Sequence, residues 1–317
     1  MRRRILITDK VHPLLSDGLK TKGYKVNYQP KMPYEEVCKE VSNYDGVIIN
    51  SKVICDRNFL DSASHLNFIG RLGSGLDIID LPYAQEVGIK VISSPEGNAN
   101  AVAEHALGML LGLLHKHHQA HQDVSALNWN REPNRGEELS GKTIGIIGYG
   151  HTGPAFAEKL KGCHVNVLVY DKYRRDMQEK EDDVTIVDID KLLSQSDIVS
   201  IHLPLTDETH MMVDQAFFNR MKKRSIVINT SRGKILDSEA LLQALSSGHI
   251  SGACLDVLEN EKPETWTEEQ TKIYKGLLDR SDVIITPHIA GWTHLSLELI
   301  ASILLEKICK YLSLIHI

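Results

Sequence analysis

The segment at residues 143–171 constrains the fold more than any other part of the chain, because a glycine turn separates two short apolar runs. Thr143–Ile147 is predicted to be a buried strand, and Gly148, Gly150 and Gly153 follow in the order G-x-G-x-x-G. Glycines here allow a tight turn, a close approach of the backbone to a pyrophosphate, and close packing of the following helix on the strand. That helix would direct its free N–H groups and the positive end of its dipole at the phosphates.

An acid at the end of the second apolar run completes this unit. Asp171 lies 18 positions after Gly153 (171 − 153 = 18), where a carboxylate can accept hydrogen bonds from both ribose hydroxyls of an adenosine. An isolated G-x-G-x-x-G is weak evidence, because glycine turns often serve packing alone. The complete unit predicts a dinucleotide-binding site.

Length, charge and cysteine content limit the classes of protein to which the chain can belong. Its 317 residues are enough for two domains, and its formal net charge of −6 gives no reason to expect a nucleic-acid partner. The longest apolar stretch, residues 101–114, contains Glu104 and His105 and is too short to cross a membrane. The five cysteines include no C-x-x-C pair, which favours a reduced protein in the cytoplasm.

The first part of the chain alternates expected strands with helical patterns, which predicts a parallel sheet. The expected strands are at 2–8, 24–29, 45–51, 66–73 and 89–95. One long helix is expected at 98–121. It carries His115, His117, His118 and His121 at spacings that could hold a metal, but no cluster of carboxylates or cysteines completes a site, and a solvated helix end explains the run more simply. We therefore predict no metal.

The same alternation continues to Pro287 and predicts a second doubly wound sheet. Its six expected strands are at 143–148, 165–171, 197–205, 225–231, 251–257 and 282–288. A final helix is expected at about 296–312 and should return to the first domain. The last seven residues, YLSLIHI, are unusually apolar for a chain end. Two interpretations stay open for them: docking on the core, or a sequence that is foreign to the protein.

Polar residues follow three of these strands at the edge where ligands bind in open parallel sheets. Arg232 follows the strand at 225–231, Glu259 and Glu261 follow the strand at 251–257, and His288 follows the last strand. Arginine, carboxylate and histidine together fit one chemistry: a cation for a substrate carboxylate or carbonyl, an acid–base histidine, and an acid that orients it.

Seven segments in a fixed order resemble the D-isomer-specific 2-hydroxyacid dehydrogenases, the family that includes phosphoglycerate, glycerate and D-lactate dehydrogenases. The segments are IGRLGSGLDIIDL, NANAVAEHALGMLL, GIIGYGHTG, VSIHLPLT, INTSRG, LDVLENE and TPHIAG. The resemblance is to a short form of phosphoglycerate dehydrogenase without a regulatory domain. It implies an α/β fold with two doubly wound parallel-sheet domains. These would be a flavodoxin-like substrate domain at 1–96 plus 288–317 and a Rossmann NAD-binding domain at 97–287.

The resemblance also implies an activity, hydride transfer between NAD and a D-2-hydroxy acid or its 2-keto acid. The family's catalytic arginine, acid and general acid–base histidine fall on Arg232, Glu261 and His288, with Glu259 as a competitor for the acid. Formate dehydrogenases carry glutamine in place of Glu261, which argues against formate as the substrate. A relative that binds NADH as a corepressor without significant turnover is the alternative function.

Further residues are implied to bind the cofactor. They are Gly148, Tyr149, Gly150, His151, Thr152, Gly153, Asp171, His202, Pro204, Thr230, Ser231 and Asp256. Pro204 and Asp256 have an equally good structural interpretation. Asp171 favours NAD, because a 2′-phosphate would lie against its negative charge, whereas basic residues soon after it, Arg174 and Arg175, could serve NADP.

The substrate is the least determined part of the prediction. Backbone N–H groups of Gly73, Ser74 and Gly75 resemble the family's cradle for the substrate carboxylate. Phosphoglycerate dehydrogenases hold the phosphate with an R-S-R-T-like segment, which here reads Asn50, Ser51, Lys52, Val53. With one cation remaining, 3-phosphoglycerate is favoured weakly, and glyoxylate, hydroxypyruvate or a bulkier 2-keto acid stay open. Trp292 could narrow the pocket or pack between domains. The resemblance also implies a homodimer with the helix at 98–121 near its interface.

Overall fold

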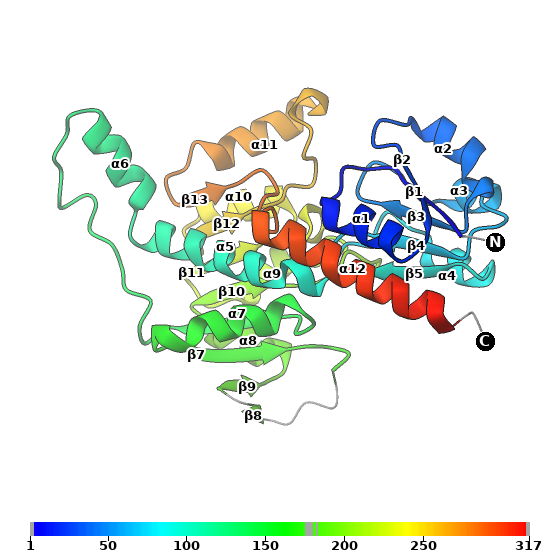
Figure 1. Ribbon diagram of the computed structural model, residues 1–317. Helices are drawn as coiled ribbons and strands as arrows, with labels where there is room; N and C mark the ends of the chain where they lie inside the picture. Colours follow the sequence, from blue (N-terminus) through cyan, green and yellow to red (C-terminus); the bar gives the residue numbers. More distant parts are fainter. Residues whose placement is uncertain (1–2, 175–179, 182, 315–317) are drawn as a thin grey trace. The chain divides into compact units, whose positions relative to one another are not determined.

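A computed structural model describes residues 3–174, 180–181 and 183–314, and the chain divides into two compact units. The first comprises Met1–Ala99 and Trp292–Ile317, and the second comprises Asn100–Gly291. Figure 1 shows strands and helices alternating along the sequence in both units. Each unit has its own sheet and its own core.

The sheet of the first unit has five parallel strands in the order β2-β1-β3-β4-β5. The strands are β1 (Arg4–Ile7), β2 (Lys25–Tyr28), β3 (Gly46–Ile49), β4 (Phe68–Arg71) and β5 (Lys90–Ser93). The reversal of strand order at β1 is that of a flavodoxin-like doubly wound sheet. The parallel sheet predicted for this part of the chain is confirmed.

Helices cover both faces of this first sheet, because successive residues of each strand point to opposite faces. On one face, strand residues such as Leu6 and Val47 pack with the helices between the strands; on the other, Ile5 and Ile48 pack with the first and last helices. The helical elements are α1 (Pro13–Thr21), α2 (Tyr34–Glu40), η1 (Val41–Asn43), α3 (Arg57–Ser62), α4 (Leu81–Glu86) and α12 (His294–Leu314).

The last helix, α12, packs on this first sheet. Ile300, Leu304 and Ile308 recur every four residues and are buried in the same core as Ile5 and Phe68. The Tyr311 ring meets Phe68 edge-on at 6.2 Å between centroids, and its hydroxyl donates to Asn67 O at 3.2 Å. The apolar chain end therefore docks on the core as far as Leu312, whereas residues 315–317 lie outside the described part.

The sheet of the second unit has eight strands in the order β13-β12-β11-β10-β6-β7-β9-β8. The strands are β6 (Thr143–Ile147), β7 (Asn166–Tyr170), β8 (Lys180–Glu181), β9 (Val184–Ile186), β10 (Ile198–Ile201), β11 (Ser225–Asn229), β12 (Ile250–Leu255) and β13 (Val283–Ile285). All neighbours are parallel except β8 and β9. The six predicted strands are present, and the order from β9 to β12 is that of a Rossmann fold. Strands β8 and β9 were not predicted, because their two and three residues are too few to show a period.

The helical elements of the second unit include two groups that cover the two faces of its sheet. The elements are α5 (Glu96–Leu114), α6 (His117–Ser125), α7 (Thr152–Leu160), η2 (Lys161–Cys163), α8 (Ile189–Gln195), α9 (Gln215–Arg220), η3 (Gly233–Ile235), α10 (Ser238–Ser246), η4 (Pro263–Thr265) and α11 (Glu268–Leu278). Residues of α5 and α7 pack on one face, and residues of α8 to α11 pack on the other. Within the described ranges, no helix combines the length and the apolar character needed to cross a membrane.

The single helix predicted at 98–121 is wrong. Helix α5 ends at Leu114, Lys116 adopts a left-handed conformation (φ 52°), and α6 begins at His117. A left-handed residue interrupts the hydrogen-bond ladder of a right-handed helix. No residue of α6 is buried, so no core packing favours a continuation in the direction of α5.

Candidate active site

The predicted cofactor and catalytic residues of the second unit gather at one edge of its sheet. Its parallel strands all end there, and a predicted site residue follows six of them within three positions. Gly148 follows β6, Asp171 follows β7, His202 follows β10, Thr230 follows β11, Asp256 follows β12 and His288 lies three residues beyond β13. This is the edge at which open α/β sheets bind ligands.

At two glycines of the turn after β6 a side chain would collide with the backbone, and at the third it would enter open space. A Cβ on Gly148, whose φ is +91°, would lie 2.3 Å from His202 O, and a Cβ on Gly153 would lie 2.3 Å from Gly148 O. A Cβ on Gly150 would meet nothing within 4 Å, so this glycine borders open space rather than the protein. His151, the residue before α7, makes no side-chain cap. The first N–H groups of α7, which starts at Thr152, are thus left for an anion.

Asp171 is held directly beside this turn. Its Oδ2 accepts a hydrogen bond from Tyr149 N at 2.7 Å, and its Oδ1 accepts from Tyr173 N at 2.9 Å and Arg174 N at 3.1 Å. A carboxylate has about four lone-pair positions, so the backbone orients this one and still leaves acceptor capacity for a hydroxyl. Of the basic residues that could serve a 2′-phosphate, Arg174 donates to Tyr149 O at 3.3 Å, and Arg175 lies outside the described residues.

Two buried polar atoms near the same strand ends have no protein partner within the described ranges: His202 Nδ1 and Thr230 Oγ1. The other ring nitrogen of His202 lies 2.9 Å from Ser200 Oγ, and burial lowers the pKa of His202 to about 4, which keeps the ring neutral at pH 7. Buried polar groups without partners are rare in native proteins. Together with the open glycine turn and Asp171, these atoms fit a bound dinucleotide.

The two remaining predicted cofactor residues in this region have their own contacts. Ser231 Oγ donates to Ile201 O at 2.7 Å, and Ser231 N donates to Asn229 Oδ1 at 3.0 Å. Pro204 is exposed, and its carbonyl accepts from Thr209 Oγ1 at 2.7 Å. These bonds shape the loops after β10 and β11.

The predicted histidine and its acid form a pair. His288 Nδ1 lies 2.9 Å from Glu261 Oε2, with both side chains less than half exposed. The hydrogen bond to Glu261 raises the pKa of His288, while burial and the charge of Arg232 oppose the rise. Because the contact occupies Nδ1, the other ring nitrogen, Nε2, is the one available to exchange a proton with a substrate.

The competing acid is engaged elsewhere. Glu259 Oε1 accepts a hydrogen bond at 2.7 Å from the backbone N–H of Ser238, the first residue of α10. A carboxylate at the N-terminus of a helix has a structural explanation, because it satisfies a free N–H and complements the dipole. The geometry therefore pairs Glu261, and not Glu259, with His288.

Arg232 lies in the loop between β11 and η3. Its Nη1 donates to Ser231 O at 2.7 Å, and its own carbonyl accepts from Asn229 Nδ2 at 3.0 Å. Its positive charge lowers the pKa of His288, which means that the guanidinium and the imidazole are within electrostatic reach of each other. The second unit thus brings together all three residues predicted to be catalytic.

Asp256 anchors the segment that carries His288. Its side chain is fully buried, and its two oxygens accept hydrogen bonds from Ile289 N at 2.9 Å and Ala290 N at 2.7 Å. Its backbone carbonyl accepts from His288 N at 2.8 Å. His288 has a φ of +56°, a conformation that costs a residue with a side chain about 1–2 kcal/mol. Of the two interpretations of Asp256, the structural one has direct support in these contacts.

The residues predicted to bind substrate belong to the first unit. Gly73 has a φ of +104° and, with Ser74 and Gly75, forms the loop after β4. Ser51 is exposed. The ammonium group of Lys52 donates to two backbone carbonyls, Thr8 O at 2.5 Å and Pro30 O at 3.0 Å.

A second cation in this region, Arg71, was not among the predicted substrate-binding residues. It lies at the C-terminal end of β4, and its Nη1 donates to Asn50 Oδ1 at 3.2 Å. Nη1 also lies 2.9 Å from where a Cβ on Gly73 would be. The arginine in IGRLGSG was the available signal, because it immediately precedes the glycine loop.

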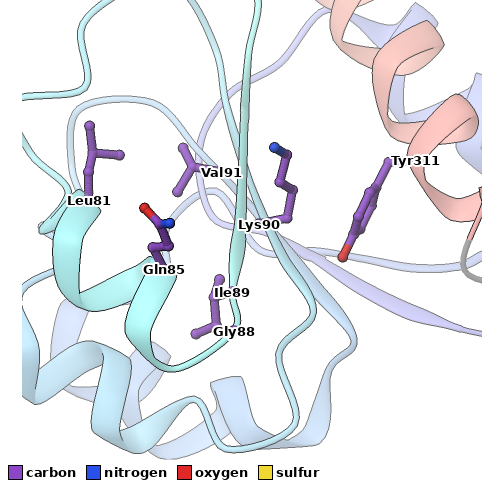
Figure 2. Close-up of a pocket in the computed structure, with 7 residues that line it drawn as sticks. All are labelled: Leu81, Gln85, Gly88, Ile89, Lys90, Val91 and Tyr311. Atoms are coloured by element: carbon purple, nitrogen blue, oxygen red, sulfur yellow. The ribbon is translucent and has the colours of Figure 1, made fainter.

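Two other features lie apart from these residues. A pocket of about 450 Å³ in the first unit is lined by Gln85 of α4, Lys90 of β5 and Tyr311 of α12, among others (Figure 2). It contains none of the predicted site residues. At the junction of α5 and α6, the rings of His115 and His117 stack at 5.7 Å. Within the described part of the chain, no group of three histidine, cysteine or acidic residues has the geometry of a metal site.

Comparison with known families agrees with the motifs. The family model described as "D-isomer specific 2-hydroxyacid dehydrogenase, NAD binding domain" matches residues 107–290. This range includes the glycine turn, Asp171 and the set of Arg232, Glu261 and His288. The residues present therefore belong to a domain that binds a nicotinamide cofactor.

Individual relatives cover nearly the whole chain. D-3-phosphoglycerate dehydrogenase of Archaeoglobus fulgidus is 35% identical over 290 residues, which are 92% of this chain and 54% of that protein. Hydroxypyruvate reductase of Thermotoga maritima is 34% identical over 280 residues, 88% of this chain and 89% of that protein. The chain spans about half the length of the phosphoglycerate dehydrogenases that it matches.

The solved structures give the same result. D-lactate dehydrogenase of Aquifex aeolicus, in complex with NAD and lactic acid, is 30% identical with a TM-score of 0.83, and the match covers 98% of this chain and 95% of that one. The match to the family model and the extent of these similarities confirm the family that the seven motifs predicted. The chain belongs to the D-isomer-specific 2-hydroxyacid dehydrogenase family.

Proposed function

We propose that this protein is an oxidoreductase that transfers a hydride between NAD and a D-2-hydroxy acid or its 2-keto acid. The observation that carries the proposal is the 2.9 Å contact between His288 Nδ1 and Glu261 Oε2, on the same sheet edge as the glycine turn. A histidine with a raised pKa, oriented by a carboxylate and close to an arginine, is suited to moving a proton at a carbonyl that carries a neighbouring carboxylate.

The roles of the three residues follow from their chemistry. In the direction of reduction, protonated His288 donates its Nε2 proton to the carbonyl oxygen, and Glu261 stabilises the imidazolium through Nδ1. Arg232 binds the substrate carboxylate and polarises the carbonyl. The bound nicotinamide supplies the hydride in reduction and accepts it in oxidation. In oxidation, neutral His288 accepts the hydroxyl proton at the same atom, so the proton is accounted for in both directions.

NAD rather than NADP is the proposed cofactor. Asp171 is fixed at the end of β7 by three backbone donors, so its negative charge cannot easily move away from a 2′-phosphate. The nearby cation Lys172 is paired with Glu208 at 2.9 Å, and Glu208 also accepts a hydrogen bond from the Tyr173 hydroxyl. The ratio of kcat/KM for NADH to that for NADPH tests the proposal, and a ratio below one would contradict it.

For the substrate, we propose a small 2-keto acid that the enzyme does not bind mainly through a phosphate. Relatives named hydroxypyruvate reductase and glyoxylate reductase match 88% and 82% of the chain. The ammonium of Lys52, the cation at the phosphate-binding position of the family, is already hydrogen-bonded to two carbonyls. 3-Phosphoglycerate, toward which the motifs point weakly, is the competing substrate. NADH oxidation with hydroxypyruvate, glyoxylate, pyruvate, 2-ketoisocaproate and phosphohydroxypyruvate ranks the candidates.

The two glutamates provide a matched pair for testing the catalytic assignment. Glu261→Gln should lower kcat/KM about 10²-fold or more, as expected for impaired general acid–base catalysis, whereas Glu259→Gln should change mainly the stability of α10.

Arg232→Ala should cost roughly 3–5 kcal/mol of transition-state stabilisation. Near-normal kcat/KM in Arg232→Ala would refute the proposed role. Binding of NADH without turnover of any 2-keto acid would favour the corepressor-like alternative.

We also propose that the protein forms a homodimer through the segment around α6. This segment exposes Leu127 to 94%, Trp129 to 81% and Val124 to 46%, and α6 buries none of its own residues. Exposed apolar side chains that lie close together commonly mark a protein interface. Light scattering should give twice the chain mass, and Leu127→Asp with Trp129→Ser should give the monomer.

All five cysteines are free thiols, which supports a reducing compartment such as the cytoplasm.

A further inference from the structure

The buried carboxylate of Asp256 has a third donor that comes from a side chain. Thr286 Oγ1 lies 2.5 Å from Asp256 Oδ1, which also accepts from Ile289 N. A buried charge requires such donors, because each unmade hydrogen bond leaves it uncompensated. Thr286 is the residue between β13 and Pro287, two positions before His288. The Thr286 hydroxyl therefore links the Asp256 carboxylate to the chain segment that this carboxylate holds, the segment that carries His288.

The direction of this hydrogen bond determines the next one. An ionised carboxylate can only accept, so Thr286 must donate its single proton to Asp256. The same hydroxyl oxygen lies 3.0 Å from His105 Nε2, and it can only act there as an acceptor. His105 must then carry a proton on Nε2. His105 Nε2 is also 3.7 Å from Asp256 Oδ1, so the N–H on that nitrogen lies close to the carboxylate as well.

We propose that His105 and Thr286 are positioning residues for His288, acting through Asp256. Helix α5 supplies His105, the position directly after β12 supplies Asp256, and the loop after β13 supplies Thr286 and His288. The chain of hydrogen bonds fixes the rotamer of the Asp256 carboxylate, and the carboxylate holds the N–H groups of Ile289 and Ala290. This keeps His288 in its left-handed conformation, with Nδ1 on Glu261 and Nε2 free.

The inference depends on the proposed hydride transfer, since it assigns a role in aiming the acid–base histidine. It also explains why a histidine, His105, occurs in the apolar segment NANAVAEHALGMLL. The proposed hydride transfer assigns no role to this histidine. His105 is about one-fifth exposed, and its hydrogen bond joins residues 181 positions apart. A histidine that is mostly buried in this way is hydrogen-bonded to a protein group, here Thr286, rather than to solvent.

Four variants test the proposal in the full chain. Thr286→Val keeps the shape and removes the donor, and Thr286→Ser restores the hydroxyl. His105→Leu removes the donor to Thr286, and His105→Gln restores an N–H. We expect kcat to fall about tenfold or more in Thr286→Val and about threefold to tenfold in His105→Leu. The Kd for NADH should stay within about twofold, and Thr286→Ser and His105→Gln should recover most of kcat. A comparable loss of kcat in all four variants, with no recovery by Ser or Gln, would refute the positioning role.

A second measurement does not need turnover. In protein labelled with ¹⁵N-histidine, His105, identified by the signal absent from His105→Gln, should show its proton on Nε2, and Thr286→Val should change that signal. Unchanged kcat and an unchanged His105 signal in Thr286→Val would refute the inference while wild-type turnover persists. An inactive wild-type protein with the expected His105 signal would instead refute the proposed function.

Discussion

The hydrogen bond between His288 and Glu261 decides at which pH the histidine changes its charge. Glu261 raises the pKa of His288 above its ordinary value near 6.5. Reduction requires the protonated ring, so kcat/KM for a 2-keto acid should be constant at low pH and fall as the pH rises through the raised pKa. Oxidation requires the neutral ring and should rise with pH through the same pKa.

Replacing Glu261 with glutamine removes the carboxylate charge and lowers that pKa. The fall of the reduction rate and the rise of the oxidation rate should both move to lower pH in Glu261→Gln, as measured by pH profiles of kcat/KM. Glu259→Gln is the control, because Glu259 contacts Ser238 N instead. Identical pH profiles in wild type and Glu261→Gln would show that the pair does not control the proton transfer.

Lys52 provides a second test at the level of one side chain. Its ammonium donates to Thr8 O and Pro30 O, so Lys52→Met should destabilise the first unit by on the order of 1 kcal/mol, the net value of a typical hydrogen bond. The ratio of kcat/KM for phosphohydroxypyruvate to that for hydroxypyruvate should remain unchanged. A selective loss of activity with the phosphorylated substrate would instead show that Lys52 binds phosphate.

The turn between β6 and α7 contains two glycines, Gly150 and Gly153, at which an added side chain would have different effects. A Cβ on Gly153 would collide with Gly148 O, whereas a Cβ on Gly150 would enter open space. Gly153→Ala should therefore lower both the melting temperature and NADH affinity. Gly150→Ala should leave the melting temperature within about 2 °C and raise the Kd for NADH about tenfold or more, because the methyl group would take space needed by a pyrophosphate. Unchanged NADH affinity in Gly150→Ala would place the phosphates elsewhere.

For the molecule as a whole, the predicted cofactor residues all lie in the unit Asn100–Gly291. NADH at 100 times its Kd should stabilise the fold that binds it by about 2.7 kcal/mol. Hydrogen exchange should then slow in the loops after β6, β10 and β11, with little change in strands β1 to β5. Calorimetry and exchange mass spectrometry measure the two effects. Equal protection of both sheets by NADH alone would contradict the assignment of the cofactor to the second unit.

The pattern of apolar residues predicted much of this architecture. Each predicted strand of the first sheet and the six predicted strands of the second are present, because buried parallel strands are short apolar runs bounded by turns. The strands β8 and β9 and the break at Lys116 were not predictable in this way. The two strands are too short to show a period, and a left-handed lysine leaves no mark in the composition of its neighbours.

The sequence by itself determined the family, the two doubly wound sheets and the strand ends at which Arg232, Glu261 and His288 occur. These features depend on local motifs, which are readable wherever the chemistry needs a particular residue at a particular spacing. Only the tertiary structure decided that Glu261 pairs with His288 while Glu259 holds α10, that Lys52 is bonded to carbonyls, and that His105 reaches Thr286. These contacts join residues between 21 and 181 positions apart in the chain. Their partners are set by packing and by the need of each buried polar atom for a hydrogen bond.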